Sequence, residues 1–564
     1  MTGADGYSGT IPRLLAQAAG RDAGGTWLRA DSGTLTFGGA AAAVALTAEA
    51  LAEAGVRKGD LVMMTARNIP PYLLCWLALT SLGAVTVAVN PRSQPAELAG
   101  LITQVSPQAL ITDGTLRALT GAALAEAASP GAAAPGFAAS QASPQVLDVA
   151  GLVPADWADP AAMAAAARRA GALPAVARPD DPATLIPTSG TTGRSKLVVQ
   201  THRAYAMAGE GFPYWMELTA ADAMMTSLPL FHVNAPAYSV LGSLACGAGL
   251  VLLERFSASG FLDAARRHGA TEFNAIGAML EMLMRQPERP DDAGTPLRLC
   301  YTGPAPERER HLEMERRFGL RIVVGYAMSE SPYGLIWAHG TRPYGTLGSV
   351  RQHPVLGTVN AARVVAPDGT DLRPGDIGEL LLRNPVVTPG YFGMPEETAR
   401  VITGGWLHTG DLVTVNADGT YTFVSRIKEV IRRRGENLSP LEVEDVLAAH
   451  PAVLECAVTG VPSDLTEEEV KAFVVTAGDQ PADFAELHAF AAARLAAFKV
   501  PRYWQQVSEL PRTPTARVAK HLLPAGHPPG EYDARPPDPA PARPVQPAEP
   551  AQPAEPAQPA QETP

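Results

Sequence analysis

The sequence is poor in cysteine and in positive charge, and each shortage excludes a class of protein. Its four cysteines, Cys75, Cys246, Cys300 and Cys456, lie far apart and form no Cys-x-x-Cys pair, so we expect neither a disulfide framework nor a zinc site. The 45 Lys and Arg residues against 57 Asp and Glu give a formal charge of −12, which argues against a binder of nucleic acid or anionic membranes. Unpaired cysteines fit a reducing compartment, and we expect a cytoplasmic protein.

Long hydrophobic runs are also scarce. One run, residues 72–89, approaches the length of about 20 residues that crosses a bilayer. Gly83 divides it into a helix-length half and a β-branched half, so we expect a buried helix followed by a core strand and no membrane span. The N-terminus shows no basic start, apolar core and small-residue cleavage site, so we expect no secretory signal.

The remaining composition is that of a globular protein, with 46% hydrophobic and 18% charged residues. Short β-rich runs such as LVMMTA, RLCYTG and RIVVGYA alternate with helical patterns from residue 26 to 420. The alternation predicts an α/β fold, with a large N-terminal domain of mixed, largely parallel sheets over residues 1–425. Residues 120–177, rich in Ala, Gly and Pro, are expected to form a surface excursion with one short helix.

A small α+β domain is predicted over residues 426–523. Ser439, Pro440 and Glu442 have the pattern of a helix N-terminus with a capping box, which predicts a helix from Pro440. We expect a second helix at 482–495 and strands around 456–458, 472–475 and 503–507. Residues 524–564 are dominated by Pro, Ala, Glu and Gln, which predicts a disordered tail.

The strongest local signal is TSGTTGRSK, residues 188–196, which follows the apolar run ATLIP. Small and hydroxylated residues let backbone amides and hydroxyls approach phosphate oxygens, and Lys196 adds positive charge. The segment is neither the G-x-x-x-x-G-K-[ST] loop nor the dinucleotide fingerprint. Taken alone, it is also compatible with a simple turn.

Six further motifs follow in order: PLFHVN (229–234), YTGPAP (301–306), GYAMSE (325–330), GWLHTGD (405–411), SRIKEVIRRRGENLSPLEVE (425–444) and LPRTPTARVAKHLL (510–523). Together with the loop they resemble the signatures of the adenylate-forming superfamily of acyl-CoA synthetases, peptide-synthetase adenylation domains and luciferases. The resemblance spans residues 10–523 and is closest to the acyl-CoA ligase branch. It implies an ATP- and Mg²⁺-dependent enzyme that converts a small carboxylic acid to an acyl-adenylate and then transfers the acyl group to CoA.

The resemblance also implies a role for each matching residue. The β- and γ-phosphates of ATP would be held by Thr188, Ser189, Gly190, Thr191, Thr192, Gly193 and Lys196. The adenosine and the α-phosphate would be held by Gly303, Pro304, Ala305, Tyr326, Ser329, Asp411 and Arg426. Glu330 would hold Mg²⁺, because a carboxylate beside polyphosphate is otherwise repelled.

Three further residues concern the acid and the second half-reaction. His232 resembles the histidine that borders the acyl pocket of acyl- and aryl-CoA ligases, which disfavours a free α-amino acid as substrate. Lys428 matches the hinge about which the small, mobile domain rotates, and Gly435 would line the pantetheine tunnel. The acid pocket is expected to be walled by residues that follow the motifs, namely Phe231, Asn234, Ile276, Gly277, Pro332 and Tyr333.

The sequence departs from the family pattern where relatives carry a glycine and then the lysine that bridges the acid and the α-phosphate. Here Ala516 and Arg517 stand at those positions, and arginine keeps the charge on a bulkier planar group. Arg517 is expected to act in catalysis in place of that lysine.

The substitution leaves two alternatives open. One is an adenylating enzyme with another acid or acceptor, such as nitrite delivered to an aryl amine, or acyl transfer to a carrier protein or amine. The other is a nucleotide-binding paralogue with little catalysis.

Overall fold

The computed structural model describes residues 7–129, 143–169, 173–188, 195–303, 306–433, 436–463, 468–478, 481–513 and 518–534. The chain divides into two compact units, Met1–Glu429 with Arg512–Val518 and Val430–Pro511 with Ala519–Pro564. No helix among the described residues is both long and apolar enough to cross a membrane.

The first unit contains a nine-stranded sheet in the order β15-β14-β13-β12-β11-β9-β10-β1-β2. The strands from β1 to β13 along this order pair in parallel, and β2, β14 and β15 add antiparallel pairs at the two edges. Strands β9 to β12 are buried along their whole length, as parallel strands covered on both faces are. The bounds are β1 Thr26–Ala30, β2 Gly33–Thr36, β9 Ala223–Thr226, β10 Gly249–Leu252, β11 Glu272–Asn274, β12 Leu299–Thr302, β13 Arg321–Met328, β14 Ser331–Ile336 and β15 Ser349–Val350.

A six-stranded sheet in the order β6-β5-β3-β4-β7-β8 is parallel except for its last pair. Its bounds are β3 Leu61–Thr65, β4 Val85–Ala88, β5 Ala109–Thr112, β6 Gln145–Asp148, β7 Pro182–Thr188 and β8 Lys196–Thr201. The apolar run at 72–89 forms a buried helix, a left-handed cap at Gly83 and strand β4, as predicted. The segment 120–177 contains more structure than expected, because β6 continues the sheet beside β5.

A third, antiparallel sheet of five strands completes the unit, with β20 and β18 both pairing with β19. Its bounds are β16 Ala361–Val365, β17 Ile377–Arg383, β18 Ile402–Thr403, β19 Trp406–Val415 and β20 Tyr421–Arg426. The unit therefore has the mixed, largely parallel α/β character that the sequence predicts.

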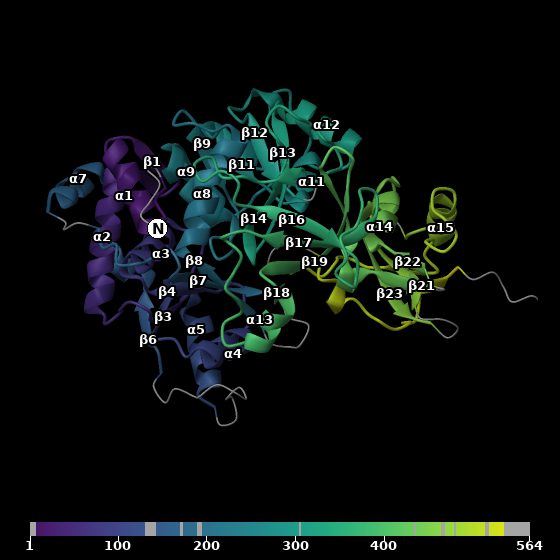
Figure 1. The fold of residues 1–564 in the computed structure, drawn as a ribbon, viewed down its shortest axis with the longest axis horizontal. Helices are drawn as coiled ribbons and strands as arrows, with labels where there is room; N and C mark the ends of the chain where they lie inside the picture. The colour runs from purple at the N-terminus through teal and green to yellow at the C-terminus, as the bar shows by residue number, and fades with distance from the viewer. Residues whose placement is uncertain are drawn as a thin grey trace, which may run out of the picture. The chain divides into compact units, whose positions relative to one another are not determined.

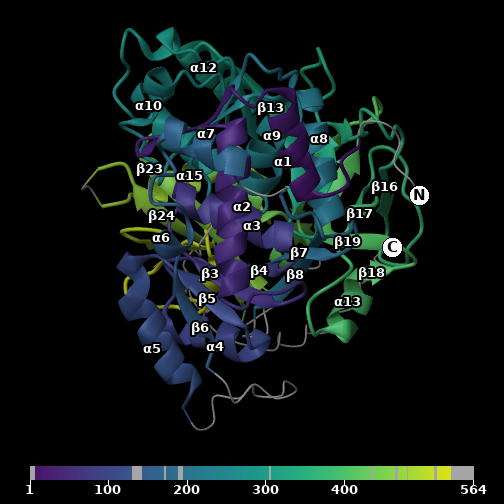
Figure 2. The same ribbon diagram turned by 90° about the vertical axis from the view of Figure 1, so that its left-hand side faces the viewer.

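Helices cover these sheets. Figure 1 shows α1 beside α8 and α9, which come much later in the chain, and Figure 2 shows α4 and α5 side by side. The α-helices are α1 Ile11–Arg21, α2 Phe37–Glu53, α3 Pro70–Leu82, α4 Pro95–Val105, α5 Arg117–Ala127, α6 Val149–Leu152, α7 Pro160–Arg169, α8 His202–Met216, α9 Leu241–Cys246, α10 Phe261–His268, α11 Gly277–Met284, α12 Arg308–Phe318 and α13 Pro395–Val401. Shorter turns are η1 Gly114–Leu116, the π-helix η2 Ala235–Val240, η3 Asp292–Gly294 and η4 Ile427–Glu429.

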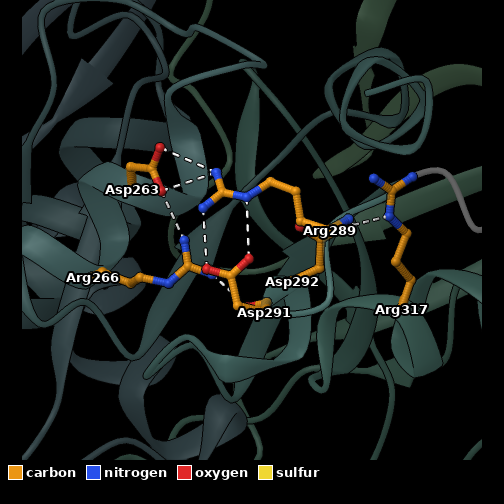
Figure 3. Close-up of polar contacts among 6 residues, drawn as sticks. All are labelled: Asp263, Arg266, Arg289, Asp291, Asp292 and Arg317. Atoms are coloured by element: carbon orange, nitrogen blue, oxygen red, sulfur yellow. Dashed lines mark hydrogen bonds and ion pairs between the residues drawn. The ribbon is translucent and has the colours of Figure 1, made fainter. Parts of the chain in front are cut away.

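A polar network joins α10, η3 and α12 (Figure 3). Arg317 is only 10% exposed and lies 2.9 Å from a carboxylate oxygen of Asp292, which is 4% exposed. Its remaining donors reach the backbone oxygens of Met284 and Gln286 at 2.6 and 2.8 Å. Arg289 instead forms ion pairs at the surface. Arg317 thus shows how this protein buries a guanidinium, with a carboxylate beside it.

The second unit is α+β, as predicted. A four-stranded sheet has the order β23-β24-β25-β26, and β21 and β22 form a separate hairpin. The bounds are β21 Ile431–Arg433, β22 Glu436–Leu438, α14 Pro440–Ala448, β23 Val453–Pro462, β24 Glu468–Thr476, α15 Phe484–Ala492, β25 Tyr503–Gln506, η5 Lys520–Leu522 and β26 Tyr532–Asp533.

Two details of this unit differ from expectation. Helix α14 begins at Pro440, but the expected capping box does not form, because Ser439 makes no side-chain cap and Glu442 pairs with Lys499 at 2.6 Å. The described chain also continues to residue 534, past the expected start of the tail at 524. The buried Lys471 fixes this extension through an ion pair of 2.6 Å with Glu531. Residues 535–564 lie outside the described residues.

Candidate adenylation site

The two ends of the expected phosphate loop are held together by a β-hairpin. Strand β7 ends at Thr188 and β8 begins at Lys196, and these two residues are partners across the antiparallel pair. The hydroxyl of Thr188 donates to the backbone oxygen of Lys196 at 3.2 Å. The loop residues Ser189, Gly190, Thr191, Thr192 and Gly193 lie outside the described residues.

The ammonium group of Lys196 contacts two residues that the sequence analysis did not identify. Its Nζ lies 2.5 Å from Oε2 of Glu397 on α13 and 4.9 Å from the centre of the Tyr391 ring. The side chains of Lys196 and Glu397 are 17% and 27% exposed. The hydrogen bond from Lys196 holds the pKa of Glu397 below its usual range. The lysine is therefore accessible and paired with a carboxylate.

Glu330 lies between β13 and β14, next to the same tyrosine. The hydroxyl of Tyr391 donates to Oε1 of Glu330 at 2.9 Å. Burial raises the pKa of Glu330, whereas the hydrogen bond from Tyr391 and the positive charges of Lys196 and Arg426 oppose that rise. Tyr391 thus brings together the expected phosphate-binding lysine and the expected magnesium ligand.

Three of the expected nucleoside-binding residues also lie together. The hydroxyl of Tyr326 donates to Oδ2 of Asp411 at 2.6 Å, and Oδ1 of Asp411 lies 3.5 Å from Nε of Arg426. Asp411 and Arg426 face each other across β19 and β20. Burial, followed by the charge of Asp411, raises the pKa of Tyr326 well above its usual range, so the phenol stays neutral. Arg426 acts electrostatically on both Tyr326 and Glu330, so its charge lies near both groups.

The wall beside these groups requires a residue without a side chain. A Cβ added at Gly303 would lie 2.3 Å from the backbone oxygen of Gly325, so only glycine fits. Pro304 and Ala305 lie outside the described residues. The backbone oxygen of Ser329 accepts a hydrogen bond from Gln200.

The expected acid end is built from the loop before η2. The rings of Phe231 and His232 lie 4.4 Å apart between centres. Oδ1 of Asn234 accepts from the Asn274 side chain at 2.8 Å, at the end of β11. Tyr333, which lies on β14, is fully buried.

The residues expected at the hinge, in the pantetheine tunnel and in the C-terminal motif are described only in part. Lys428 lies in η4, close to the end of the first unit. Gly435, Ala516 and Arg517 lie outside the described residues. Lys520, which follows Arg517, pairs with Glu444 at 2.7 Å within the second unit.

The donor set suits magnesium held together with a nucleotide. Within the described residues, no group of three or more His, Cys, Asp or Glu side chains is arranged to hold a metal ion. Mg²⁺ commonly takes one or two carboxylates and completes its ligands with waters and substrate phosphates. A single half-buried carboxylate, Glu330, near Lys196 fits that mode.

Known proteins with similar sequences and structures identify the family of this chain. The chain matches the family described as AMP-binding enzyme over residues 15–392 and the AMP-binding enzyme C-terminal domain over residues 442–517. A crotonobetaine/carnitine–CoA ligase of Salmonella enteritidis PT4 (strain P125109) is 31% identical over 490 residues, covering 85% of this chain and 90% of the relative.

Solved structures of the o-succinylbenzoate CoA synthetase MenE from Bacillus subtilis have the same fold. The complex with the acyl-adenylate OSB-AMP has a TM-score of 0.76 at 25% identity and covers 91% of this chain and 98% of that one. The complex with ATP and a magnesium ion has a TM-score of 0.75 at 26% identity and covers 90% and 98%. This chain therefore belongs to the AMP-binding, adenylate-forming enzyme family and, within it, to the AMP-forming acid–CoA ligases.

Proposed function

We propose that this ligase activates a carboxylic acid with ATP and passes the acyl group to the thiol of CoA. In the first step a carboxylate oxygen attacks the α-phosphorus, a C–O–P bond forms and pyrophosphate leaves. In the second step the CoA sulfur attacks the acyl carbon and AMP leaves with the oxygen. The observation that supports this most directly is the convergence of Lys196, Glu330 and Asp411, from three distant motifs, around Tyr391, Tyr326 and Arg426.

The nucleotide would be held at both ends by these groups. Asp411 presents a carboxylate that can accept hydrogen bonds from ribose hydroxyls, with Arg426 beside it. The Tyr326 ring and the backbone at Gly303 would border the adenine. Lys196 would meet the β- and γ-phosphates once it leaves Glu397, because phosphate oxygens carry more negative charge than one carboxylate.

Glu330 would hold Mg²⁺ against the phosphates. When bound, the ion would neutralise charge on the leaving pyrophosphate. A bound cation would oppose the rise that burial causes in the pKa of Glu330 and would keep this half-buried carboxylate ionised.

Arg517 is proposed to bridge the acid carboxylate and the α-phosphate, and His232 to border the acid. After adenylation the second unit would rotate about Lys428 so that Gly435 lines the path of the CoA thiol. We propose a cytoplasmic location, where ATP and CoA are both present.

The proposal is tested by offering the purified protein ATP, Mg²⁺ and a panel of acids that includes nitrite, with and without CoA. We expect pyrophosphate and AMP only when a carboxylic acid is present, and a thioester mass only when CoA is added. AMP with nitrite and an aryl amine, together with a new N–N bond, would instead establish the alternative acid and acceptor. Nucleotide binding without turnover of any acid would establish a non-catalytic paralogue.

A further inference from the structure

Arg351 is buried without a carboxylate partner among the described residues. Its side chain is 1% exposed. Nε donates to the backbone oxygen of Leu335 at 2.8 Å, Nη1 donates to the hydroxyl of Tyr238 at 3.1 Å, and Nη2 donates to the hydroxyl of Tyr301. A guanidinium has five N–H groups, so these contacts leave its charge unbalanced and part of its donor capacity unused.

The rings around Arg351 do not supply the missing negative charge. Trp215, Tyr238 and Tyr301 have ring centres 4.9, 5.5 and 5.4 Å from its guanidinium carbon. Burial raises the pKa of Tyr238 far above its usual range, so that phenol remains neutral. Cation–π contacts offset only part of the cost of removing a guanidinium from water.

Two other arginines with little exposure, Arg317 and Arg433, are paired with carboxylates. Arg317 has Asp292 at 2.9 Å (Figure 3), and Arg433 in the second unit has Glu469 at 2.6 Å. Breaking such a pair is costly, and a lone buried charge carries a similar penalty. An unpaired buried charge therefore calls for a partner that arrives with a ligand.

Arg351 also contacts residues in or next to the motifs of the candidate site. Tyr238 follows the PLFHVN motif, and its hydroxyl donates at 2.8 Å to the backbone oxygen of Pro332, just after Glu330. Tyr301 begins the YTGPAP motif. A Cβ added at Gly325, the first residue of GYAMSE, would lie 2.4 Å from Nη2 of Arg351. Residues of two motifs, and one residue that follows a third, thus meet at one guanidinium.

We propose that Arg351 determines the acid specificity by binding a second anionic group, so that the substrates of this ligase are dicarboxylic acids. This inference rests on the proposed adenylation of carboxylic acids. One carboxylate would be activated at the α-phosphate while the other pairs with Arg351. Because the guanidinium is enclosed, the rings of Trp215, Tyr238 and Tyr301 must part to admit the second carboxylate.

The experiment compares pyrophosphate release with acids matched in carbon skeleton, such as glutarate with pentanoate, adipate with hexanoate and isophthalate with benzoate. The wild-type protein is expected to prefer at least one dicarboxylate over its partner by about tenfold or more in kcat/KM. Arg351→Met is expected to abolish or reverse that preference, and Arg351→Lys to retain part of it. Arg317→Met is the matched control, a buried arginine outside the site, and its preference is expected to equal that of the wild type.

Stability measurements separate specificity from a structural role. Arg351→Met is expected to keep or raise the melting temperature, because an apolar residue replaces an unpaired buried charge. Arg317→Met is expected to lower the melting temperature, because Asp292 loses its ion-pair partner. Equal loss of activity on both classes of acid in Arg351→Met, or a wild type that prefers monocarboxylates throughout, would overturn the inference while leaving the ligase function intact.

If no acid is turned over, the proposed function is refuted. A binding measurement then still tests the role of Arg351. Titration with the same dicarboxylates is expected to change the fluorescence of Trp215, and the change is expected to vanish in Arg351→Met and in Trp215→Phe. An unchanged signal in the wild-type protein would overturn the role of Arg351.

Discussion

Nζ of Lys196 and Oε2 of Glu397 lie 2.5 Å apart, so the lysine expected to meet the ATP phosphates is already paired with a carboxylate. On the proposed role of Lys196, ATP displaces Glu397 from the lysine when the phosphates bind. The pair is partly exposed, and pairs of this kind contribute little free energy. We therefore expect the contact to weaken nucleotide binding slightly without preventing it.

Glu397→Gln is expected to lower the KM for ATP by about two- to fivefold, with kcat little changed, because the competing charge is removed. Glu396→Gln, an exposed neighbour on the same helix, is the matched control and should leave KM unchanged. Steady-state kinetics at several ATP concentrations measures both. A higher KM in Glu397→Gln would mean that Glu397 positions Lys196 for the nucleotide.

Tyr391→Phe is expected to move the acid limb of the pH profile of kcat/KM to higher pH. The tyrosine hydroxyl donates to Glu330 and favours its ionised form, so its loss raises the pKa of Glu330 further. Activity that needs an ionised Glu330 then fails at a higher pH. The exposed Tyr214→Phe serves as control. An identical acid limb in Tyr391→Phe and wild type would show that Glu330 does not control the profile.

Arg517→Lys is expected to preserve or raise the rate of adenylation, because lysine is the residue that the family resemblance implies at this position and it keeps the charge. Arg517→Ala is expected to lower that rate by about 10²-fold or more, the scale for losing one group that stabilises a transition state. Pyrophosphate release in single turnovers measures both variants. A tenfold loss in Arg517→Lys would assign the arginine a specialised role.

His202 makes stability depend on pH. Its ring is fully buried, and burial lowers its pKa from 6.5 to about 4. His202 therefore binds a proton near pH 6.5 in the unfolded chain but only near pH 4 in the folded chain. The free energy of unfolding falls as the pH drops from 6.5 towards 4. The free energy of unfolding is expected to be about 2 kcal/mol lower at pH 5 than at pH 8.

Denaturant unfolding of the wild type and His202→Gln at pH 5 and 8 measures this loss, with the exposed His339→Gln as control. His202→Gln should remove most of the pH dependence, and His339→Gln should not. The same slope in all three proteins would place the pH dependence elsewhere in the chain.

Local patterns were sufficient for most of the fold. Gly83 divides an apolar run because a left-handed cap ends the helix there, and the β-rich runs become buried parallel strands. Strand β6 was missed because it lies at the sheet edge and its residues, Gln145–Asp148, are exposed or half-buried without alternation. The extension to residue 534 was missed because it depends on the buried Lys471, distant in sequence.

In the site, too, local motifs were found from the sequence, whereas contacts between distant residues were missed. Motifs singled out Lys196, Glu330, Asp411 and Arg426, which come from distant parts of the chain and lie near one another in the structure. Glu397 lies 201 residues from Lys196, and no periodicity or motif joins such distant charges before the chain folds. Arg351 was missed for a similar reason, because a single arginine forms no sequence pattern. Only the folded structure shows that its side chain is buried without a carboxylate side chain beside it among the described residues.

The most direct test of acid adenylation follows oxygen atoms from the acid. The protein is given ATP, Mg²⁺, CoA and an acid whose carboxylate is labelled with ¹⁸O, and the AMP is analysed by mass spectrometry. Attack by the carboxylate on the α-phosphorus predicts one ¹⁸O atom in each AMP. AMP without the label, formed together with the thioester, would contradict an acyl-adenylate and the role assigned to the site.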